Sequence, residues 1–391
     1  MNKNTVLKEL ADLLIQHKED ILLANQQDMQ QAEGIDDTLR DRLKVDEKKV
    51  MSMVSAVRNV MEMPDPEGKI LYEYTHPNGM LVQNRIVPFG NILIIYESRP
   101  DVTIEAAVSA FKAGNTIYLK GGKEAKNTNK CLVSLWHKAL ENNQFEASKV
   151  KYLDMNRTDA QKMIRENTHR FDLIIPRGGE RLIRFIKTNT QVPVLVSGRG
   201  NNFMYVHNDA DFEMATNLIL NGKQRLSVCN ALDKVFFNKN IPQLHEKLSL
   251  LLQQIKNESI EVFGTDELSN TYTTVKKIEG ESLFFEEFLA AKILFSTCEN
   301  MSEAIEKINR YSGGHTAVIV CKDQKIAETF QQKVDCAVVS HNASSRFTDG
   351  GEFGFGAEIA ISTQKMHFRG PVGMAQLVSN KWFVYGNGQT R

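Results

Sequence analysis

Cys229 is the residue of this chain best placed to do covalent chemistry. It lies in the segment QRLSVCNA, residues 224–231, between an amphipathic helical pattern and an apolar run typical of a β-strand. A thiolate at such a junction can attack an activated carbonyl and hold the acyl group as a thioester. The chain has five cysteines, and a cysteine outside a disulfide is most often a small buried apolar residue. The rest of the sequence must decide between these two roles.

Two glycine pairs that follow predicted strands could hold a phosphate group. Gly121 and Gly122 stand in YLKGGKEA, and Gly178 and Gly179 stand in IIPRGGERLIRF, directly before an amphipathic helix. Backbone amides at a helix N-terminus bind anions, and Arg177 would add a positive charge, so the second pair suits a pyrophosphate. A strand-to-helix turn that simply requires glycine explains either pair equally well. The usual GxGxxG fingerprint of dinucleotide sites is absent.

Charged and polar side chains near the ends of predicted strands are further candidate ligands. Lys120 and Lys123 could contact a ribose or a 2′-phosphate, although a lysine after a strand is more often solvated. The predicted strand at residues 91–96 presents Ser98 and Arg99 at its carboxyl end, where open α/β sheets bind ligands. Arg99 is either a surface ion-pair partner or an anion ligand for the substrate.

A glycine-rich polar stretch, HNASSRFTDGGEFGFGAEIAISTQ at residues 341–364, predicts a loop that lines a site. Ordering so many glycines is unfavourable unless a site uses them. A crossover between domains is the alternative, and the stretch can serve both purposes. Arg346 is a candidate anion ligand there, as is Arg99, on the chemistry of the guanidinium group alone. The nine histidines show no HExxH or other paired spacing, so no metal site is predicted.

The elements that would position these residues change character along the chain. From Thr5 to about Met63 apolar residues recur at helical spacing, and residues 69–88 alternate around HPNG as in a β-hairpin. Short apolar runs then alternate with helical segments, as in parallel sheets buried on both faces. The pattern predicts a doubly wound α/β domain, a second α/β domain after Cys229 and a C-terminal strand in KWFVYGNGQTR. The predicted strands between the hairpin and that last strand are residues 91–96, 115–120, 149–154, 171–175, 192–196, 232–237, 291–295, 316–321 and 336–340.

Length and composition limit the possible functions. At 391 residues the chain is long enough for two or three domains. Lysine plus arginine equals aspartate plus glutamate at 48 each, which favours a small-molecule substrate over nucleic acid or an anionic membrane. The odd number of cysteines and the lack of a CxxC pair argue against a disulfide framework. No apolar stretch suits a signal peptide or a membrane span. We therefore expect a cytoplasmic enzyme.

Six segments resemble the gamma-glutamyl phosphate reductase family of the aldehyde dehydrogenase superfamily. They are VPFGNILIIYESRPDVTIEAA, AGNTIYLKGGKEA, DLIIPRGGERLI, SVCNALD, HNASSRFTDGGEFGFGAEI and STQKMHFRGP, and the similarity extends from about residue 5 to the C-terminus. The resemblance implies an α/β, aldehyde-dehydrogenase-like fold with three parts. These are a Rossmann-type cofactor-binding domain (residues 1–68 and 89–224, with 356–376 returning to it), a catalytic domain (225–355) and a β-stranded oligomerisation arm (69–88 and 377–391).

The resemblance also implies a reaction. It is the NADPH-dependent reduction of L-glutamate 5-phosphate to L-glutamate 5-semialdehyde with release of phosphate, the second step of proline biosynthesis. Cys229 would attack the acyl phosphate, and hydride would reduce the thioester. The backbone amide at Cys229 would stabilise the oxyanion together with Ser98, which stands where many aldehyde dehydrogenases have asparagine. Asn230 is a further candidate catalytic residue. Glu287, or its neighbour Glu286, is a candidate ligand of the nicotinamide ribose.

Two departures from the family pattern bear on the chemistry. The chain has VSGRGN where the family commonly has a Glu-Thr-Gly motif, so Val196 stands at the glutamate position. In aldehyde-oxidising relatives that glutamate activates the water that hydrolyses the thioester, and its absence is compatible with net reduction. The approach to the nucleophile, GKQRLSVCNA, is one residue shorter than usual and has Leu226 in place of proline.

Two alternative functions stay open on the sequence alone. One is a superfamily member that acts on another acyl donor, such as an acyl-CoA. The other is a non-catalytic, nucleotide-binding partner subunit, for example of glutamate 5-kinase, the enzyme that makes the labile substrate. The sequence does not distinguish NADPH from NADH. The two edge strands of the arm favour a homodimer or a higher homo-oligomer.

Overall fold

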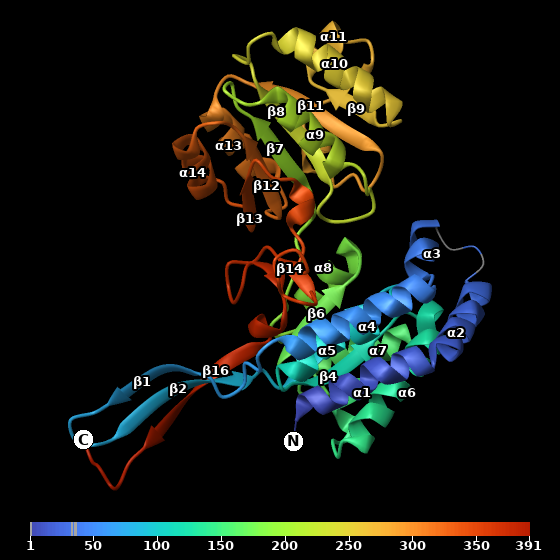
Figure 1. The fold of residues 1–391 in the computed structure, drawn as a ribbon, viewed down its shortest axis with the longest axis vertical. Helices are drawn as coiled ribbons and strands as arrows, with labels where there is room; N and C mark the ends of the chain where they lie inside the picture. Colours follow the sequence, from blue (N-terminus) through green and yellow to red (C-terminus); the bar gives the residue numbers. More distant parts are fainter. Residues whose placement is uncertain (1, 33, 35–36) are drawn as a thin grey trace. The chain divides into compact units, whose positions relative to one another are not determined.

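The computed structural model describes residues 2–32, 34 and 37–391 of the chain. The chain divides into two compact units, each considered by itself. The first comprises Met1–Val196, Gly354–Ala360 and Val372–Arg391, and the second comprises Ser197–Phe353 and Ile361–Pro371. Most elements of both units are labelled in Figure 1.

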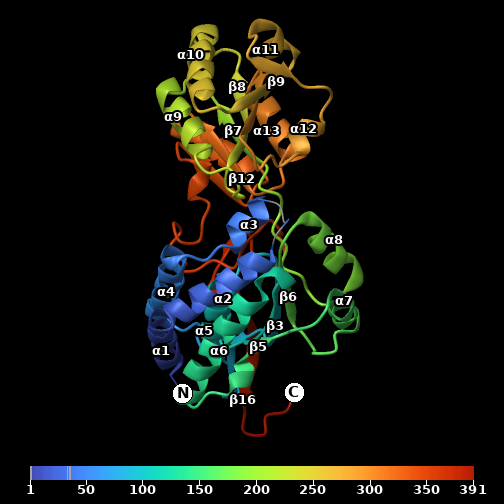
Figure 2. The ribbon, with the colours of Figure 1, turned by 90° about the vertical axis from the view of Figure 1, so that its right-hand side faces the viewer.

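The first unit is built on a four-stranded parallel sheet with helices on both faces. The strand order is β5-β4-β3-β6, with β3 (Asn91–Tyr96), β4 (Thr116–Lys120), β5 (Val150–Tyr152) and β6 (Leu173–Arg177). Its helices are α1 (Lys3–Gln16), α2 (Lys18–Gln31), α3 (Asp37–Leu43), α4 (Glu47–Glu62), α5 (Val102–Lys112), α6 (Lys126–Asn142), α7 (Arg157–Glu166) and α8 (Glu180–Asn189). Figure 2 shows α7 and α8 on the side of the strands opposite to α1 and α4.

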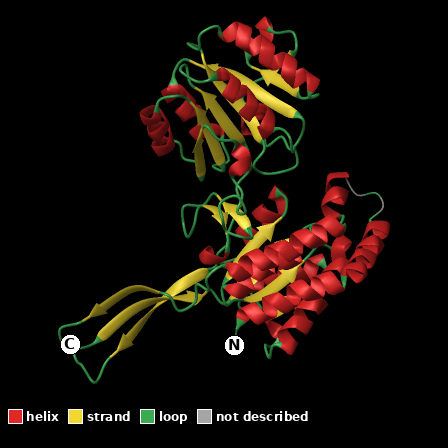
Figure 3. Ribbon diagram, viewed as in Figure 1, coloured by secondary structure: helices red, strands yellow, loops and turns green. Residues whose placement is uncertain are grey.

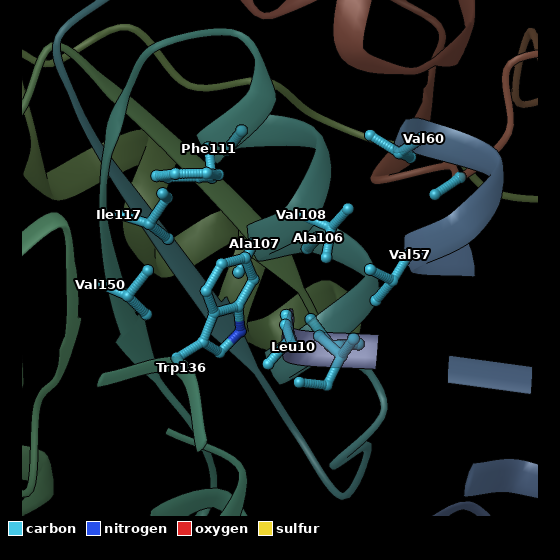
Figure 4. Packing of buried hydrophobic residues seen from close by; sticks show 14 of the residues in the cluster. Leu10, Val57, Val60, Ala106, Ala107, Val108, Phe111, Ile117, Trp136 and Val150 are labelled. Carbon is cyan, nitrogen blue, oxygen red and sulfur yellow. The ribbon is translucent and has the colours of Figure 1, made fainter. Parts of the chain in front are cut away.

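Successive residues of the strands face different cores, as the period of a β-strand requires. Ile92 and Ile94 pack into the larger core with α1, α4, α5 and α6, whereas Leu93 and Ile95 pack with α7 and α8. In the larger core the fully buried Trp136 lies beside Phe111 and Leu10 (Figure 4). The unbroken apolar runs of the sequence therefore correspond to strands covered on both faces.

The arm of the first unit is a three-stranded antiparallel sheet in the order β1-β2-β16. It consists of β1 (Ile70–Thr75), β2 (Leu81–Pro88) and β16 (Val378–Tyr385). Figure 3 shows the three strands extending together away from the helices of this unit. The hairpin predicted at residues 69–88 thus pairs with the C-terminal strand of the same chain.

The second unit is built on a seven-stranded parallel sheet in the order β10-β9-β11-β8-β7-β12-β13. Helices α13 and α14 pack in one core on it, and α9 and α10 pack in another. The strands are β7 (Asn202–Val206), β8 (Leu232–Asn238), β9 (Glu261–Gly264), β10 (Val275–Lys277), β11 (Lys292–Cys298), β12 (Thr316–Val320) and β13 (Val338–His341). The helices are α9 (Phe212–Gly222), α10 (Leu244–Asn257), α11 (Asp266–Thr271), α12 (Ser282–Phe285), α13 (Met301–Tyr311) and α14 (Gln324–Lys333). Two short strands, β14 (Ala360–Ser362) and β15 (Gly370–Val372), pair with each other.

The structure corrects the sequence prediction in two places. Residues 192–196 form one β-bridge, from Ile174 to Val194, rather than a strand. Pro193 lies within this run and has no N–H to donate. The boundary between the units lies at Val196 and Ser197, whereas the sequence placed a domain boundary after residue 224. The reason is β7, which was not predicted and which pairs with β8 and β12 in the sheet of the second unit.

Candidate active site

Cys229 lies in the second unit, in the irregular segment between α9 and β8, and its side chain is half-buried. The backbone around it is held by Asn202, the first residue of β7. The Asn202 side-chain amide donates to the carbonyl oxygens of Cys229 and Ala231, both at 2.7 Å. The loop that carries the thiol is therefore tied to the central strands of the sheet.

Gly200 approaches the nucleophile segment more closely than any side chain could. A Cβ atom built on Gly200 would lie 2.1 Å from the carbonyl oxygen and 2.6 Å from the Cα of Cys229. Such distances are far inside van der Waals contact, so a residue other than glycine would displace one of the two backbones. Gly200 is in the VSGRGN segment, which the sequence singled out only for lacking a glutamate.

The side chain of Asn230 anchors the loop that follows β13. Its amide group donates to the carbonyl oxygens of Arg346 at 3.0 Å and Thr348 at 3.1 Å, and its Oδ1 accepts from the Arg346 guanidinium. Ser345 Oγ donates to the Asn230 carbonyl at 2.8 Å. These bonds engage the polar groups of the Asn230 side chain and fix the residue that follows Cys229, so a catalytic role for Asn230 stays a prediction.

Arg346 combines this contact with an electrostatic interaction with Cys229. Burial lowers the pKa of Arg346, and the nearby Arg225 lowers it further, while negative charge at Asp349 and Cys229 raises it. A cation that interacts with a cysteine stabilises the thiolate form of that cysteine. Arg346 is thus electrostatically coupled to Cys229, and its role as an anion ligand stays a prediction.

The other four cysteines have surroundings that disfavour a thiolate. All five cysteines are described and none is in a disulfide. Burial raises the pKa of Cys298 to about 12 and those of Cys321 and Cys336 to about 11. Cys131 is half-buried on α6, and burial raises its pKa also. Reactivity with an electrophile is therefore expected to concentrate on Cys229.

Glu287 also reaches the nucleophile region within the second unit. Its carboxylate accepts a hydrogen bond from the backbone N–H of Gly200, and burial raises its pKa, with Asp233 adding to the effect. The neighbouring Glu286 offers its backbone carbonyl to Lys234. Of the two glutamates named from the sequence, the structure therefore places the carboxylate of Glu287 beside the Cys229 segment.

The predicted pyrophosphate residues lie at a switch point in the sheet of the first unit. Since β4 and β5 lie on one side of β3 and β6 lies on the other, the chain reverses direction across the sheet between β3 and β6. Open α/β sheets bind ligands outside the carboxyl ends of the strands at such a point. Arg177 ends β6, and Gly178 and Gly179 lead into α8. A Cβ atom on Gly179 would meet no atom within 4 Å, so open space surrounds this helix N-terminus and suits a phosphate group.

A carboxylate already contacts this position. The Gly179 N–H donates to Glu97 at 3.1 Å, and a Cβ atom on Gly178 would lie 2.6 Å from the same carboxylate oxygen. The amide thus holds an anion, although from the protein itself. A phosphate at Gly179 requires that the exposed side chain of Glu97 move away.

Ser98 is buried, and both its hydroxyl group and its backbone N–H are hydrogen-bonded. Its hydroxyl donates to Glu124 at 2.8 Å and its N–H donates to the same oxygen at 2.9 Å, while its φ of 45° marks a tight turn after β3. An oxyanion role would require the hydroxyl to leave Glu124. A Cβ atom on Gly122 would lie 2.0 Å from the Glu124 carboxylate, so a glycine is needed for the backbone at residue 122 to lie this close to Glu124.

The remaining predicted ligands of the first unit differ in exposure. Lys120 is half-buried, its Nζ donates to the Gly121 carbonyl at 2.8 Å, and burial lowers its pKa. Lys123 is exposed on the short helix that follows. Arg99 is half-buried and interacts with the carboxylate of Glu105. Arg99 therefore has an acidic partner in its own unit.

Comparison with known proteins identifies the family. The model of the Aldehyde dehydrogenase family matches residues 1–262. The gamma-glutamyl phosphate reductases of Geobacillus sp. (strain WCH70) and Carboxydothermus hydrogenoformans are 39% and 40% identical, and each match covers 100% of this chain and 94% of the relative. The chain belongs to the gamma-glutamyl phosphate reductase family. The crystal structure of the gamma-glutamyl phosphate reductase from Thermotoga maritima matches with a TM-score of 0.94 at 38% identity, covering 100% of this chain and 94% of that one.

More distant structures share the fold of the gamma-glutamyl phosphate reductase family. An acetylating aldehyde dehydrogenase from Geobacillus thermoglucosidasius is 16% identical with a TM-score of 0.71, and the match covers 100% of this chain and 92% of that one. Family membership in the aldehyde dehydrogenases implies a nicotinamide cofactor. Within the described ranges, no group of three or more His, Cys, Asp or Glu residues could hold a metal ion, and no helix is long and apolar enough to cross a membrane.

Several residues of this family member were missed from the sequence. Asn202 and Gly200 act on Cys229 from positions 27 and 29 residues earlier in the chain, and only a folded sheet brings them together. Asp233 and Lys234 did leave a signal, because two charges inside an apolar strand are costly to bury without partners. Glu97 left none, since an exposed glutamate after a strand is common.

Proposed function

We propose that this chain reduces L-glutamate 5-phosphate to L-glutamate 5-semialdehyde with release of phosphate, through a thioester on Cys229. The supporting observation is a half-buried cysteine on a rigidly held turn, in a chain that aligns over its full length with gamma-glutamyl phosphate reductases. This reaction is the second step of proline biosynthesis.

The chemistry of the chain's own residues follows from the position of Cys229. Its thiolate forms a C–S bond with the γ-carbonyl carbon, and the C–O bond to phosphate breaks. A nicotinamide, when bound, supplies the hydride that reduces the thioester carbon. The C–S bond then breaks, which releases the aldehyde and regenerates the thiolate. The backbone amide at Cys229 would hold the oxyanion at each tetrahedral stage, and the released phosphate takes its proton from solvent.

We propose that Arg346 stabilises negative charge at this site. One guanidinium nitrogen is committed to Asn230, and the remaining N–H groups can donate to the substrate or to the departing phosphate. Its interaction with Cys229 favours the thiolate before substrate binds. Arg99 is proposed as a second anion ligand, since it is half-buried at the carboxyl end of β3 and carries a positive charge.

NADPH is the proposed cofactor, held by the first unit. The N-terminus of α8 at Gly178 and Gly179 would receive the pyrophosphate once the Glu97 side chain has moved away, with Arg177 adding positive charge, because this helix terminus lies at the switch point of the sheet. The turn after β4, with Lys120, Gly121, Gly122 and Lys123, would receive the adenosine ribose and its 2′-phosphate. Glu287 is proposed to contact the nicotinamide ribose with the carboxylate lone pairs that the Gly200 N–H does not use.

Val196 supports reduction rather than oxidation to an acid. It is an apolar, buried residue at the position where aldehyde-oxidising relatives carry the glutamate that activates water. An alkyl side chain cannot act as a general base, so the thioester is protected from hydrolysis by this route. Hydride transfer then has no competing reaction at that position.

We propose that the arm joins two copies of the chain and that the protein works in the cytoplasm. All six residues of β1 are exposed, and the arm exposes large side chains that a partner would cover, among them Tyr72, Tyr74, Trp382 and Val384. Exposed apolar side chains on edge strands are typical of interfaces. The kinase that makes the labile acyl phosphate is a further candidate partner, because direct transfer would protect the substrate from water.

The proposed function is tested most simply in the reverse direction. L-glutamate 5-semialdehyde should support reduction of NADP⁺ only when inorganic phosphate is present. Coenzyme A in place of phosphate should give no activity. Turnover that requires coenzyme A instead would identify another acyl donor. Absence of turnover with either, together with nucleotide binding, would indicate a non-catalytic partner subunit.

A further inference from the structure

Strand β8 carries a buried cluster of charges directly after the nucleophile segment. The side chains of Lys223, Asp233 and Lys234 are 1%, 2% and 0% exposed. Lys223 Nζ lies 2.8 Å from Asp233 Oδ1, and Lys234 Nζ lies 3.8 Å from Asp233 Oδ2. Charges this deeply buried destabilise a fold unless every one has partners, so the remaining contacts of the cluster indicate its role.

The cluster holds the two ends of a short segment, Glu286–Phe288. The backbone N–H of Phe288 donates to Asp233 Oδ2 at 2.9 Å. Lys234 Nζ donates to the Glu286 carbonyl and lies 3.9 Å from the centroid of the Phe288 ring. Glu287 stands between these two anchored residues, so its backbone cannot shift without breaking a charge-assisted hydrogen bond.

Residues 199–201 are hydrogen-bonded to the two residues that directly precede this segment. Arg199 donates to the Phe285 carbonyl at 3.1 Å, and Asn201 donates to the Phe284 carbonyl at 2.7 Å. Between them, the backbone N–H of Gly200 interacts with the carboxylate of Glu287 and favours its charged form. Gly200 in turn packs against the backbone of Cys229.

We propose that Glu287 is a positioning residue for Cys229, with Asp233 and Lys234 as the anchors that fix Glu287. The Glu287 carboxylate fixes the Gly200 amide, and the Gly200 backbone fixes the carbonyl and Cα of the nucleophile. This proposal rests on the proposed function only in taking Cys229 as the reactive residue. It adds a task that is separate from any contact with the nicotinamide ribose.

The chemical requirement at residue 287 is a hydrogen-bond acceptor, not a negative charge. The Gly200 N–H needs an oxygen, and burial together with Asp233 works against an ionised carboxylate there. Glutamine has the same length and offers the same oxygen, whereas leucine has similar bulk and no acceptor. Glu287→Gln and Glu287→Leu therefore separate positioning from charge.

The test measures the rate at which iodoacetamide alkylates Cys229 in the enzyme without cofactor or substrate. Glu287→Gln should alkylate within about twofold of the wild-type rate, and Glu287→Leu should alkylate about tenfold more slowly, because loss of orientation at a reacting atom has effects of this order. This assay needs no turnover, so it remains informative if the proposed reaction is wrong.

Lys234→Met extends the test to the anchors without touching the cofactor. Methionine fills the buried space and leaves Asp233 paired with Lys223, but it removes the bond to the Glu286 carbonyl. It should slow alkylation of Cys229, whereas the control Lys239→Met, just beyond the end of the same strand and partly exposed, should not. Circular dichroism identifies any variant that does not fold, and only the folded variants are used to test the proposal.

Three results would overturn the proposal. The first is a folded Glu287→Leu or Lys234→Met that alkylates at the wild-type rate. The second is a Glu287→Gln as slow as Glu287→Leu, which would assign the effect to charge. The third is a change confined to the KM for NADPH, which would leave Glu287 with the ribose contact alone.

Discussion

Gly200 and Cys229 are in direct backbone contact, although 29 residues separate them in the chain. A Cβ atom on Gly200 would lie 2.1 Å from the carbonyl oxygen of Cys229. The nucleophile is thus located by a residue without a side chain, in a segment that leads into the central strand β7. Together with the amide of Asn202, this contact makes the turn before β8 a fixed part of the sheet.

Gly200→Ala should therefore reduce activity far more than stability. The added methyl group must push the Cys229 backbone away, and a displacement near 1 Å at a reacting atom lowers the turnover number by about 100-fold. Gly386→Ala, in the arm, is a control for activity, since a Cβ atom there would meet only the end of the flexible Gln389 side chain. Wild-type turnover by a folded Gly200→Ala would contradict the role assigned to this contact.

Arg346→Met should make Cys229 react less readily near neutral pH. Removal of the guanidinium removes a positive charge that favours the thiolate, so the pH midpoint of alkylation should rise by roughly one unit. The pH dependence of the iodoacetamide rate measures this midpoint. Arg225→Met, at an exposed position, provides the comparison. An unchanged midpoint in Arg346→Met would leave Arg346 with substrate binding alone.

His315 should make the protein less stable in acid. Its Nδ1 lies 2.8 Å from Thr316 Oγ1, whose own hydrogen is donated to Thr348, so Nδ1 carries the proton. Nε2 is buried with no hydrogen-bond partner. Burial lowers the pKa of His315 from 6.5 to about 4. The unfolded chain therefore takes up a proton at a higher pH than the folded chain does.

The sign of this effect follows from the two pKa values. Above pH 6.5 His315 is neutral in both the folded and the unfolded chain. As the pH falls from 6.5 through about 4, the free energy of unfolding decreases. The loss amounts to roughly 3 kcal/mol in total. His315→Gln should remove this part of the pH dependence, as measured by urea unfolding at about pH 7.5 and about pH 4.5. Equal slopes in the variant and the wild type would show that His315 does not titrate in this way.

Lys120→Met should discriminate between the two nicotinamide cofactors. If Lys120 binds the 2′-phosphate, the variant loses a charge-assisted hydrogen bond, and the KM for NADPH should rise by about tenfold or more. The KM for NADH should change little. The exposed Lys123 is the matched position, and Lys123→Met should have the smaller effect. Equal increases for both cofactors would exclude 2′-phosphate recognition by Lys120.

Much of the fold could be predicted because its strands are buried on both faces. Runs such as residues 91–96 and 316–321 are apolar for that reason, and they correspond to β3 and β12. The prediction failed at residues 192–196, where an equally apolar run contains Pro193 and forms only one bridge. It also missed β7, whose first residue is a buried asparagine that serves the nucleophile turn instead of an apolar core.

The site was predictable where chemistry needs a particular residue type. Cys229 could be proposed from the sequence because few side chains can carry a thioester. The sequence named Asn230 as a candidate catalytic residue but did not reveal its hydrogen bonds to Arg346 and Thr348, because these residues are more than 100 positions away in the chain. The same limit applies to Asp233 and Lys234, whose partners at Glu286–Phe288 only the folded chain reveals.

The measurement that tests the central claim most directly is NADPH oxidation by Cys229→Ala with L-glutamate 5-phosphate, beside a fluorescence titration of NADPH binding to the same protein. We predict that turnover is abolished while NADPH binds within about twofold of the wild-type affinity, because alanine removes only the atom that becomes acylated. Sustained turnover by the folded variant would contradict a thioester on Cys229 and the mechanism built on it.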